Sequence, residues 1–398
     1  MRAFDFIEEE RKRQINTIEL IASENFVSGN ILKAMGSCFT NKYAEGKPYH
    51  RYYGGCEVVD ELESYCQELW KMVFKTNYHV NVQPHSGANA NLAAMMAFLK
   101  PGDKVLSMGL NCGGHLSHGS PVNISGKLFE VIQYGVDAKG YINYDEFLRK
   151  IALFRPNLIL AGASAYPRII DFEKMYSLIQ NVRDRNPGYN PIFMVDMAHI
   201  AGLIVANDHP SPFGLADVIT TTTHKTLRGP RGGLIFCKPQ YEKQVDSAVF
   251  PGTQGGPLEN IIAAKAICAE EALNLEYWRY IHQVVKNSKA MAEEFVSMGY
   301  EVITGGTDNH LFLIDLSHTH PQLSGKMVQD ELDKYRITLN KNCVPNETRS
   351  PMQASGLRIG TAAMTTRGYI EEDFILVAHK IDEIIQGMVK NNAPVSEK

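Results

Sequence analysis

A lysine in an unusual polar stretch is the residue of this sequence best suited to covalent chemistry. Four threonines and a histidine precede Lys225, and a turn rich in glycine and proline follows it at residues 229–233. The run at residues 216–219 predicts a buried strand that leads toward Lys225. A buried lysine is costly unless it is paired, deprotonated or covalently used. The stretch therefore suggests a lysine that forms a Schiff base with pyridoxal phosphate (PLP), and a solvated loop lysine is the alternative.

A carboxylate that could serve the same cofactor ends the apolar strand predicted at residues 192–196. Asp196 precedes Lys225 by about one α/β unit, so both side chains can reach the carboxyl edge of one sheet. A carboxylate at that edge can pair with a pyridine nitrogen, keep it protonated and make the cofactor a strong electron sink. The alternative for an aspartate at a strand end is a helix cap or a turn residue.

Two further places in the sequence could bind anions. A strand at residues 78–84, the small residues Ser86 and Gly87, and a helix at residues 90–99 follow one another. The N-terminus of such a helix favours a phosphate, although serine also simply caps helices. Arg358 lies between apolar neighbours in the strand predicted at residues 356–360. Its planar fork suits a substrate carboxylate, and a structural salt bridge is the alternative.

Two histidines and a tyrosine-rich segment are less specific signals. His115 and His118 could be metal ligands, but no third ligand is near in the sequence, so no metal site is predicted. A structural or ring-stacking role is preferred for both. Tyrosines, a carboxylate and paired glycines at residues 43–46 and 51–55 suggest a binding loop, or else an exposed polar loop.

These candidates require a scaffold in which strand ends meet at one edge. Apolar strands at residues 104–108, 157–162 and 192–196 alternate with helical segments, which indicates a doubly wound, mostly parallel α/β core. Helical patterning at residues 258–298 leads into a smaller α/β region. The predicted division is an N-terminal arm helix at residues 1–16, a large domain at 17–272 and a small C-terminal domain at 273–398.

The composition is that of a globular enzyme-sized chain. Its 398 residues are 44% hydrophobic and 21% charged, with a net charge of -4, so no nucleic-acid partner is expected. No membrane partner is expected either, because no apolar run is long enough to cross a bilayer. The seven cysteines form no Cys-x-x-Cys pair, which favours a reduced, metal-free intracellular protein. The acidic N-terminus lacks the apolar region of a signal peptide, so a cytoplasmic location is expected.

Ordered motifs along the chain resemble the serine hydroxymethyltransferases (glycine hydroxymethyltransferases), PLP enzymes of fold type I. The stretch around Lys225 matches the cofactor-lysine signature of that family closely, and several motifs in order are far more specific than one glycine pattern. The resembling residues are 20–25, 43–46 with 51–55, 113–128, 195–203, 220–233, 250–258 and 355–361.

The resemblance implies roles at the cofactor. Lys225 would hold PLP covalently, Asp196 would pair with the pyridine nitrogen, and His115 would stack on the ring. The other implied cofactor contacts are Ser86, Gly87, Ser164, His199 and Thr222, with Tyr43 and Gly256 from a neighbouring subunit.

The resemblance also implies roles at the substrates. Arg358 would bind the carboxylate of the amino acid, and Glu45 would exchange protons with the serine hydroxyl and with the folate. The implied catalytic residues are Lys225, Glu45, His224 and Tyr53. The amino acid would contact Ser23, Tyr53 and Arg358. The folate would contact Glu45, Leu110, Gly113, Gly114, Leu116 and Asn342.

The implied activity is the reversible transfer of the hydroxymethyl carbon of serine to tetrahydrofolate, giving glycine and 5,10-methylenetetrahydrofolate. A homodimer with shared active sites is expected. Residues 47–50, 88–89 and 259–260 depart from the family pattern near the expected folate and dimer surfaces. One alternative is therefore a folate-independent 3-hydroxy amino-acid aldolase, transaldolase or α-methylserine-type hydroxymethyltransferase. Another is a catalytically silent paralogue that serves as a scaffold.

Overall fold

The computed structural model describes residues 1–392, and the chain forms two compact units. The large unit comprises residues 27–282, and the small unit combines residues 1–26 with the chain from residue 283 onward. The boundary lies inside helix α11 (Leu275–Ser297). The division at residues 16 and 272 stays a prediction.

The large unit is organised around a seven-stranded sheet, which confirms the predicted α/β fold. The strand order is β4-β10-β9-β8-β7-β5-β6, and only β10 runs antiparallel to its neighbours. The strands are β4 (His79–Asn81), β5 (Lys104–Met108), β6 (Glu130–Tyr134), β7 (Leu158–Ala161), β8 (Ile192–Asp196), β9 (Val218–Thr222) and β10 (Gly233–Cys237).

Three strands of this sheet are buried along their whole length. Every residue of β7, β9 and β10 is buried, as expected for strands covered on both faces by helices. The threonines of β9 are buried although they are polar, because their hydroxyl groups form hydrogen bonds inside the unit. The predicted bounds of β5 and β8 are confirmed to the residue.

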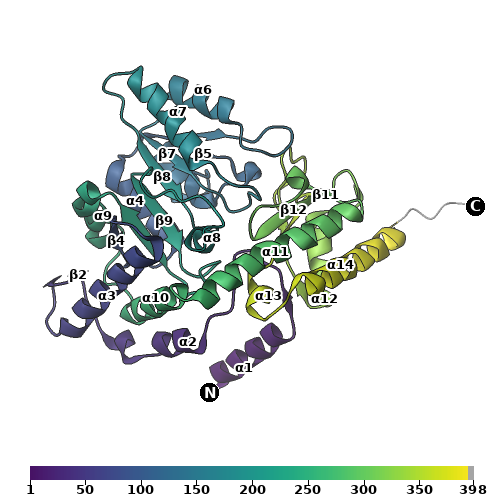
Figure 1. Cartoon of the computed structure of the whole chain (residues 1–398), viewed down its shortest axis with the longest axis horizontal. Coiled ribbons are helices and arrows are strands. Elements are labelled where there is room, and N and C mark those ends of the chain that lie inside the picture. Colours follow the sequence, from purple (N-terminus) through teal and green to yellow (C-terminus); the bar gives the residue numbers. More distant parts are fainter. Residues whose placement is uncertain (393–398) are drawn as a thin grey trace, which may run out of the picture. The chain divides into compact units, whose positions relative to one another are not determined.

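Helices connect the strands and cover the sheet. Helices α3 and α10 pack against each other (Figure 1), and the continuous helical patterning predicted at residues 258–298 is divided between α10 and α11 at Leu273 and Asn274. The helices of the large unit are α2 (Gly29–Met35), α3 (Glu57–Phe74), α4 (Gly87–Phe98), α5 (Ile124–Leu128), α6 (Tyr144–Phe154), α7 (Phe172–Asp184), α8 (Ala201–Val205), α9 (Glu242–Ser247) and α10 (Glu259–Ala272).

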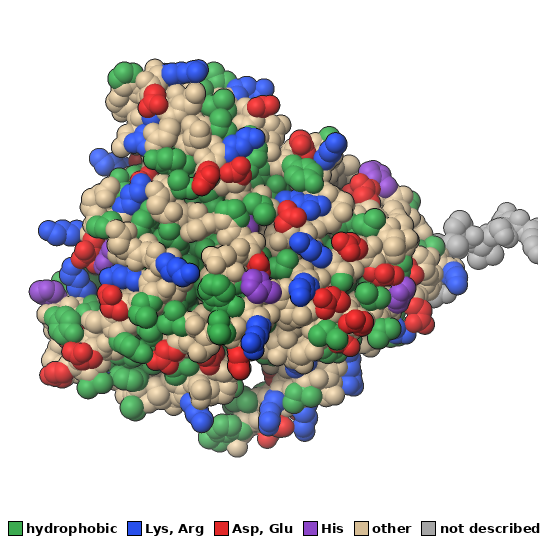
Figure 2. Space-filling view, viewed as in Figure 1, with side chains coloured by type: hydrophobic (Ala, Val, Ile, Leu, Met, Phe, Trp, Pro, Cys, Tyr) green, Lys and Arg blue, Asp and Glu red, His purple; other side chains and the backbone are tan. Residues whose placement is uncertain are grey.

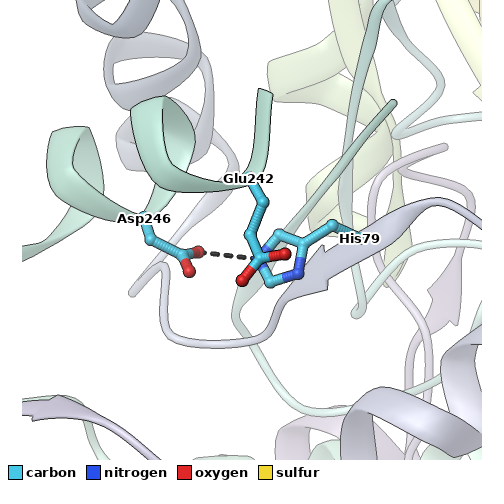
Figure 3. A group of neighbouring side chains, drawn as sticks. All are labelled: His79, Glu242 and Asp246. Atoms are coloured by element: carbon cyan, nitrogen blue, oxygen red, sulfur yellow. Dashed lines mark hydrogen bonds and ion pairs between the residues drawn. The ribbon is translucent and has the colours of Figure 1, made fainter. Parts of the chain in front are cut away.

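An ion-pair cluster joins β4 to α9 at the end of the sheet. His79 points toward Glu242 and Asp246, which lie one turn apart on α9 (Figure 3). One carboxylate oxygen of Asp246 accepts hydrogen bonds from His79 Nε2 and Asn81 Nδ2, each at 2.8 Å. The ammonium group of Lys47 lies 3.7 Å from Glu242 and 4.0 Å from Asp246. Because a lysine already supplies positive charge here, we interpret the cluster as a structural clamp.

The small unit contains a four-stranded antiparallel sheet in the order β11-β12-β15-β14. Its core includes Phe295, Phe312 and Phe374, all fully buried. The remaining elements are α1 (Arg2–Ile15), β1 (Ile18–Glu19), β11 (Glu301–Val302), β12 (Leu311–Asp315), α12 (Gly325–Lys334), β13 (Ile337–Thr338), β14 (Asn340–Asn342), β15 (Gly356–Gly360), α13 (Ala362–Thr366) and α14 (Glu371–Asn392).

The surface mixes charges of both signs. Basic and acidic side chains are interspersed with hydrophobic ones over the face shown in Figure 2. Among the helices of residues 1–392, none combines the length and the apolar character that crossing a bilayer requires.

Candidate active site

Lys225 and Asp196 lie at the carboxyl edge of two neighbouring parallel strands. Asp196 is the last residue of β8 and pairs in register with Thr220 of β9. Lys225 follows the end of β9 by three residues, and each of the two side chains is only 9% exposed. The structure therefore places this predicted pair together, and the lysine charge acts on the carboxylate.

Asp196 is held in its ionised form by three hydrogen-bond donors. Its Oδ2 accepts from His118 Nε2 at 2.9 Å and from Asn91 Nδ2 at 2.8 Å, and its Oδ1 accepts from the backbone N–H of Ala198 at 3.0 Å. Burial alone would raise the pKa of Asp196. The hydrogen bonds from His118 and Asn91 and the charge of Lys225 outweigh burial and hold that pKa well below its ordinary value.

The tautomer of His118 follows from its two contacts. The backbone N–H of His115 donates to Nδ1 of His118 at 3.4 Å, so the ring proton lies on Nε2 and is donated to Asp196. His118 is 1% exposed, so this contact is shielded from water. The sequence did not assign His118 to Asp196, because the two residues are far apart along the chain.

The ring of His115 is oriented by Ser117. Nδ1 of His115 accepts from the backbone N–H of Ser117 at 3.1 Å and lies 2.7 Å from Ser117 Oγ. The same hydroxyl oxygen accepts from Asn91 Nδ2 at 2.9 Å. Sequence reasoning missed Asn91, Ser117 and Thr220 as site residues. A buried asparagine within the alanine-rich helix α4 was the available signal, because a buried amide requires partners.

Threonine hydroxyl groups hold His199 next to the lysine loop. Thr226 Oγ1 donates to the carbonyl oxygen of His199 at 2.9 Å and accepts from the N–H of Gly202 at 3.0 Å. Thr222 Oγ1 donates to the carbonyl oxygen of Ala198 at 3.5 Å. These contacts bring the predicted residues Thr222 and His199 to the edge that carries Lys225.

The predicted anion site lies against the same edge. Ser86 is the N-cap of α4, and its Oγ accepts from the N–H of Asn89 at 3.2 Å. A Cβ atom at Gly87 would lie 2.5 Å from Cγ2 of Thr222, so only glycine allows the start of α4 to approach β9 this closely. The helix N-terminus, with its free N–H groups, therefore lies beside the strand that leads to Lys225.

Four of the predicted folate residues of the large unit lie in one glycine-rich loop: Leu110, Gly113, Gly114 and Leu116. The N–H of Ser164 donates to the carbonyl oxygen of Gly113 at 2.7 Å, which joins this loop to the segment after β7. Gly114 packs tightly against the end of β5. Leu110 and Leu116 are 41% and 46% exposed, so they offer apolar surface on either side of the two glycines.

Four other predicted residues form a separate patch on the large unit, which we call the tyrosine patch: Tyr43, Glu45, Tyr53 and Gly256. The rings of Tyr43 and Tyr53 meet edge to face at 5.4 Å, and both side chains are more than half exposed. A Cβ atom at Gly256 would lie 3.2 Å from the Tyr43 ring. Glu45, through its charge and a hydrogen bond, raises the pKa of Tyr43.

His224 is neutral at physiological pH. Burial, together with the charges of Lys225 and Arg231, lowers its pKa to about 3. Its Nδ1 is buried, and no hydrogen-bond partner for that atom occurs in the described part of the chain. His224 can therefore exchange a hydrogen bond with a bound molecule but does not carry a charge there.

The small unit holds the other predicted substrate residues. Arg358 lies in β15, and its Nε donates to Oδ1 of Asn340 at 3.0 Å. Burial lowers the pKa of Arg358 to about 10, so the guanidinium group stays charged at neutral pH. The N–H of Gly360 donates to the carbonyl oxygen of Leu20 at 2.8 Å, which holds the segment carrying Ser23 beside β15. Asn342 lies in β14, the neighbouring strand.

The family model described as serine hydroxymethyltransferase matches residues 1–381 of this chain. The chain belongs to the serine hydroxymethyltransferase family. Members of this family are fold-type I PLP enzymes, and this chain is a PLP-dependent glycine hydroxymethyltransferase in that broad sense. The match covers both units, so the small unit belongs to the same enzyme as the lysine edge.

The residues at the carboxyl edge have the chemistry that PLP requires of a serine hydroxymethyltransferase. The edge offers a buried lysine for a covalent bond, an ionised carboxylate for the pyridinium N–H and a helix N-terminus for the phosphate. A carboxylate has about four lone-pair sites, and Asp196 uses three for the donors described above. A pyridinium N–H can be the fourth donor.

Proposed function

We propose that this chain catalyses the reversible transfer of the hydroxymethyl carbon of serine to tetrahydrofolate, giving glycine and 5,10-methylenetetrahydrofolate. The observation that carries the proposal is the buried pair of Lys225 and ionised Asp196 at the ends of neighbouring strands, within a chain of this family. When bound, PLP supplies an electron-poor ring that accepts the electrons of the cleaved Cα–Cβ bond.

Five residues would hold the cofactor in a defined orientation. Lys225 binds it covalently, Asp196 accepts its pyridinium N–H, and His115 covers one face of the ring. Ser86 and Gly87 bind the phosphate at the N-terminus of α4. The proposed cofactor set is completed by Ser164, His199 and Thr222, with Tyr43 and Gly256 from a second subunit.

The amino acid would be bound by Arg358 and Ser23, together with His224 and Tyr53. Arg358 forms a bidentate contact with its carboxylate, with help from Ser23. Fixing the carboxylate would hold the amino acid in one orientation and so determine which bond at Cα is presented for cleavage. His224, being neutral, and Tyr53 position the amino acid by hydrogen bonds.

Proton transfer would fall to Glu45. A carboxylate next to the serine hydroxyl group can take its proton as the Cα–Cβ bond breaks and return it in the reverse direction. We assign the folate to Leu110, Gly113, Gly114 and Leu116 of the large unit. The family resemblance implies Glu45 and Asn342 as its other contacts.

The tyrosine patch supports a homodimer with shared active sites. Tyr43, Tyr53, Glu45 and Gly256 lie together on one chain and expose aromatic surface, so one subunit would offer all four to its neighbour. Helix α1 has no buried residue and exposes Phe4 and Ile7, which a second subunit would cover. The seven free cysteines support a cytoplasmic location.

The test separates folate-dependent chemistry from the alternatives. Purified protein is titrated with PLP, and the exchange of the glycine α-proton with solvent is then measured before and after tetrahydrofolate is added. We expect a visible absorbance band of the lysine-linked cofactor and faster exchange with folate. Lys225→Ala should lose that band and most turnover, whereas undiminished turnover would remove Lys225 from its role.

Two other outcomes would favour other functions. Exchange and retro-aldol cleavage that are unaffected by tetrahydrofolate would favour the folate-independent aldolase or α-methylserine-type transferase, which the departures at residues 47–50, 88–89 and 259–260 make the second candidate. A protein that acquires no visible band at saturating PLP would instead be a catalytically silent member of the family.

A further inference from the structure

Asn91 is a polar residue in a helix made almost entirely of small and apolar side chains. It lies in α4 among Ala90, Ala93, Ala94 and Met95, and it is 2% exposed. Asparagine is a poor helix former, and a buried amide without hydrogen bonds is costly. Its presence there is accounted for only by the contacts of its side chain.

The amide of Asn91 uses all of its strong hydrogen-bonding groups except one lone pair. One Nδ2 proton goes to Asp196 Oδ2 at 2.8 Å and the other to Ser117 Oγ at 2.9 Å. Its Oδ1 accepts from Thr220 Oγ1 at 2.5 Å. A flipped amide would place its oxygen against the carboxylate of Asp196, so the contacts leave one orientation.

The contact with Ser117 extends to His115. Because Ser117 Oγ accepts from Asn91, its own proton is free to go to His115 Nδ1, 2.7 Å away. The backbone N–H of Ser117 donates to the same nitrogen. The hydrogen bonds thus run in one direction, from Asn91 through Ser117 to the imidazole ring, which leaves the ring proton of a neutral His115 on Nε2.

We propose that Asn91 is a positioning residue that couples Asp196 to His115. The inference rests on the proposed PLP site, in which Asp196 receives the pyridinium N–H and His115 covers the ring. Both side chains are then set by a single buried amide, supplied by the helix whose N-terminus is assigned to the phosphate. Asn91 itself touches neither the cofactor nor the amino acid; it acts through the two side chains that do.

The main test replaces Asn91 by two residues of similar size. Asn91→Leu removes the donors, and Asn91→Asp places a second carboxylate against Asp196, where like charges oppose ionisation of both. We expect the dissociation constant of PLP to rise by roughly tenfold in Asn91→Leu and by more in Asn91→Asp. A roughly tenfold loss is typical when a residue that contacts a ligand loses the partner that orients it. The visible circular dichroism of bound PLP should also change, because it reports the orientation of the ring.

Asn81 provides a matched control. It is a buried asparagine of the same unit, 6% exposed, whose Nδ2 also donates to a carboxylate at 2.8 Å, that of Asp246 in the clamp of Figure 3. Asn81→Leu should lower the thermal stability of the apoprotein while leaving the PLP dissociation constant and the circular dichroism of the bound cofactor at wild-type values.

The outcomes separate this inference from the proposed function. If wild-type protein does not bind PLP, the proposed function fails. If wild type binds PLP and Asn91→Leu binds it with equal affinity and an unchanged dichroism spectrum, the coupling role is overturned.

A variant that removes one hydroxyl group, and with it the two hydrogen bonds that link Asn91 to His115, decides the matter if Asn91→Leu does not fold. Ser117→Ala breaks only the arm toward His115, so the dichroism of bound PLP should change while its affinity falls by only a few-fold. An unchanged dichroism spectrum in Ser117→Ala would also overturn the coupling.

Discussion

Two buried carboxylates of the large unit have pKa values shifted in opposite directions. Asp196 at the active edge is 9% exposed and Glu259 at the start of α10 is 1% exposed, so burial acts against the charge of both. Asp196 has three donors and a pKa well below its ordinary value. For Glu259, no donor among the described residues lies within hydrogen-bond distance of either carboxylate oxygen, and its pKa is raised to about 8.

The surroundings of Glu259 explain its shift. Burial raises its pKa most, and the nearby carboxylates of Glu63 and Asp60 add to the effect, while Arg51 and Lys265 oppose it. Arg51 is already engaged, since it donates to Asp60 at 2.8 Å and to Glu63 at 2.6 Å. With two cations facing three acids, the cluster is balanced when one acid keeps its proton.

At Asp196 and Glu259, the presence or absence of hydrogen-bond donors separates the acid whose pKa is lowered from the acid whose pKa is raised. Desolvation disfavours the anion at both positions, and hydrogen bonds from His118 and Asn91 reverse the outcome at Asp196 alone. A catalytic carboxylate that must face a pyridinium group therefore requires an oriented set of donors, whereas Glu259 can remain a neutral acid within the packing of α10.

The largest effect is expected from Asp196→Asn. The amide has the same shape but no charge, so it no longer keeps a pyridinium nitrogen protonated, and turnover should fall on the order of 10³-fold. Steady-state kinetics with serine measure this. Asp217→Asn serves as the control, because Asp217 pairs with Lys238 at 2.8 Å in the same sheet. Near-normal turnover in Asp196→Asn would end the assignment of Asp196 to the cofactor.

Removing Arg51, one of the two cations of the Glu259 cluster, should have the next largest effect. Arg51→Leu leaves Asp60 and Glu63 buried without their guanidinium partner, which should lower the free energy of unfolding by about 3 kcal/mol. Urea unfolding measures it, with Arg13→Leu as the control for an exposed pair, expected to cost less than about 1 kcal/mol. Equal losses in the two variants would mean that burial adds nothing to the Arg51 pairs.

Glu259→Gln should change how stability depends on pH. The folded chain keeps the proton of Glu259 up to about pH 8, whereas the unfolded chain loses it near 4.5. The stability that this proton contributes is complete below pH 4.5 and is lost as the pH rises through 8, by on the order of 1 kcal/mol per unit. The wild type should therefore lose more stability than Glu259→Gln between pH 5 and 9.

The pH experiment isolates Glu259 from Asp196. The pKa of Asp196 is lowered in the folded chain. Its contribution to stability is therefore complete at every pH above the ordinary pKa of an aspartate, and it is lost only as the pH falls below that value. Glu276→Gln, an exposed carboxylate on α11, is the control and should follow the wild type. Parallel stability curves for wild type and Glu259→Gln would show that Glu259 is ionised in the folded protein.

The smallest effect is expected from Thr220→Val. This change removes only the hydroxyl group that donates to Asn91 Oδ1 and leaves both donors of the amide in place. Losing one neutral hydrogen bond should lower the free energy of unfolding by about 1 kcal/mol. Thermal unfolding of the apoprotein measures this loss. If Thr220→Val changed PLP affinity as much as Asn91→Leu does, Thr220 would be shown to fix the orientation of the Asn91 side chain.

The positions of the two residues proposed for the covalent and electronic work could be predicted from local sequence. Lys225 and Asp196 follow strands whose apolar patterns are clear, and strand ends at one edge of a parallel sheet meet by topology. The partners of Asp196 could not be predicted this way. Asn91 and His118 come from a helix and a loop more than seventy residues away, and their own patterns suggest a helix interior and a metal or structural histidine.

Glu259 is a second residue whose surroundings could not be predicted from local sequence. An acid in the first turn of a helix is favourable in sequence terms and would ordinarily be solvated, because it complements the helix dipole. Only the packing of α10 against α3 encloses it beside Glu63.

The sequence by itself determined the α/β fold, the family and the lysine–aspartate pair, because periodicity, turn residues and ordered motifs are local properties. The tertiary structure alone decided which buried acid is charged. For Asp196 and Glu259, that outcome depends on how deeply the folded chain buries each carboxylate and on which donors and charges it brings near, and no local pattern encodes it.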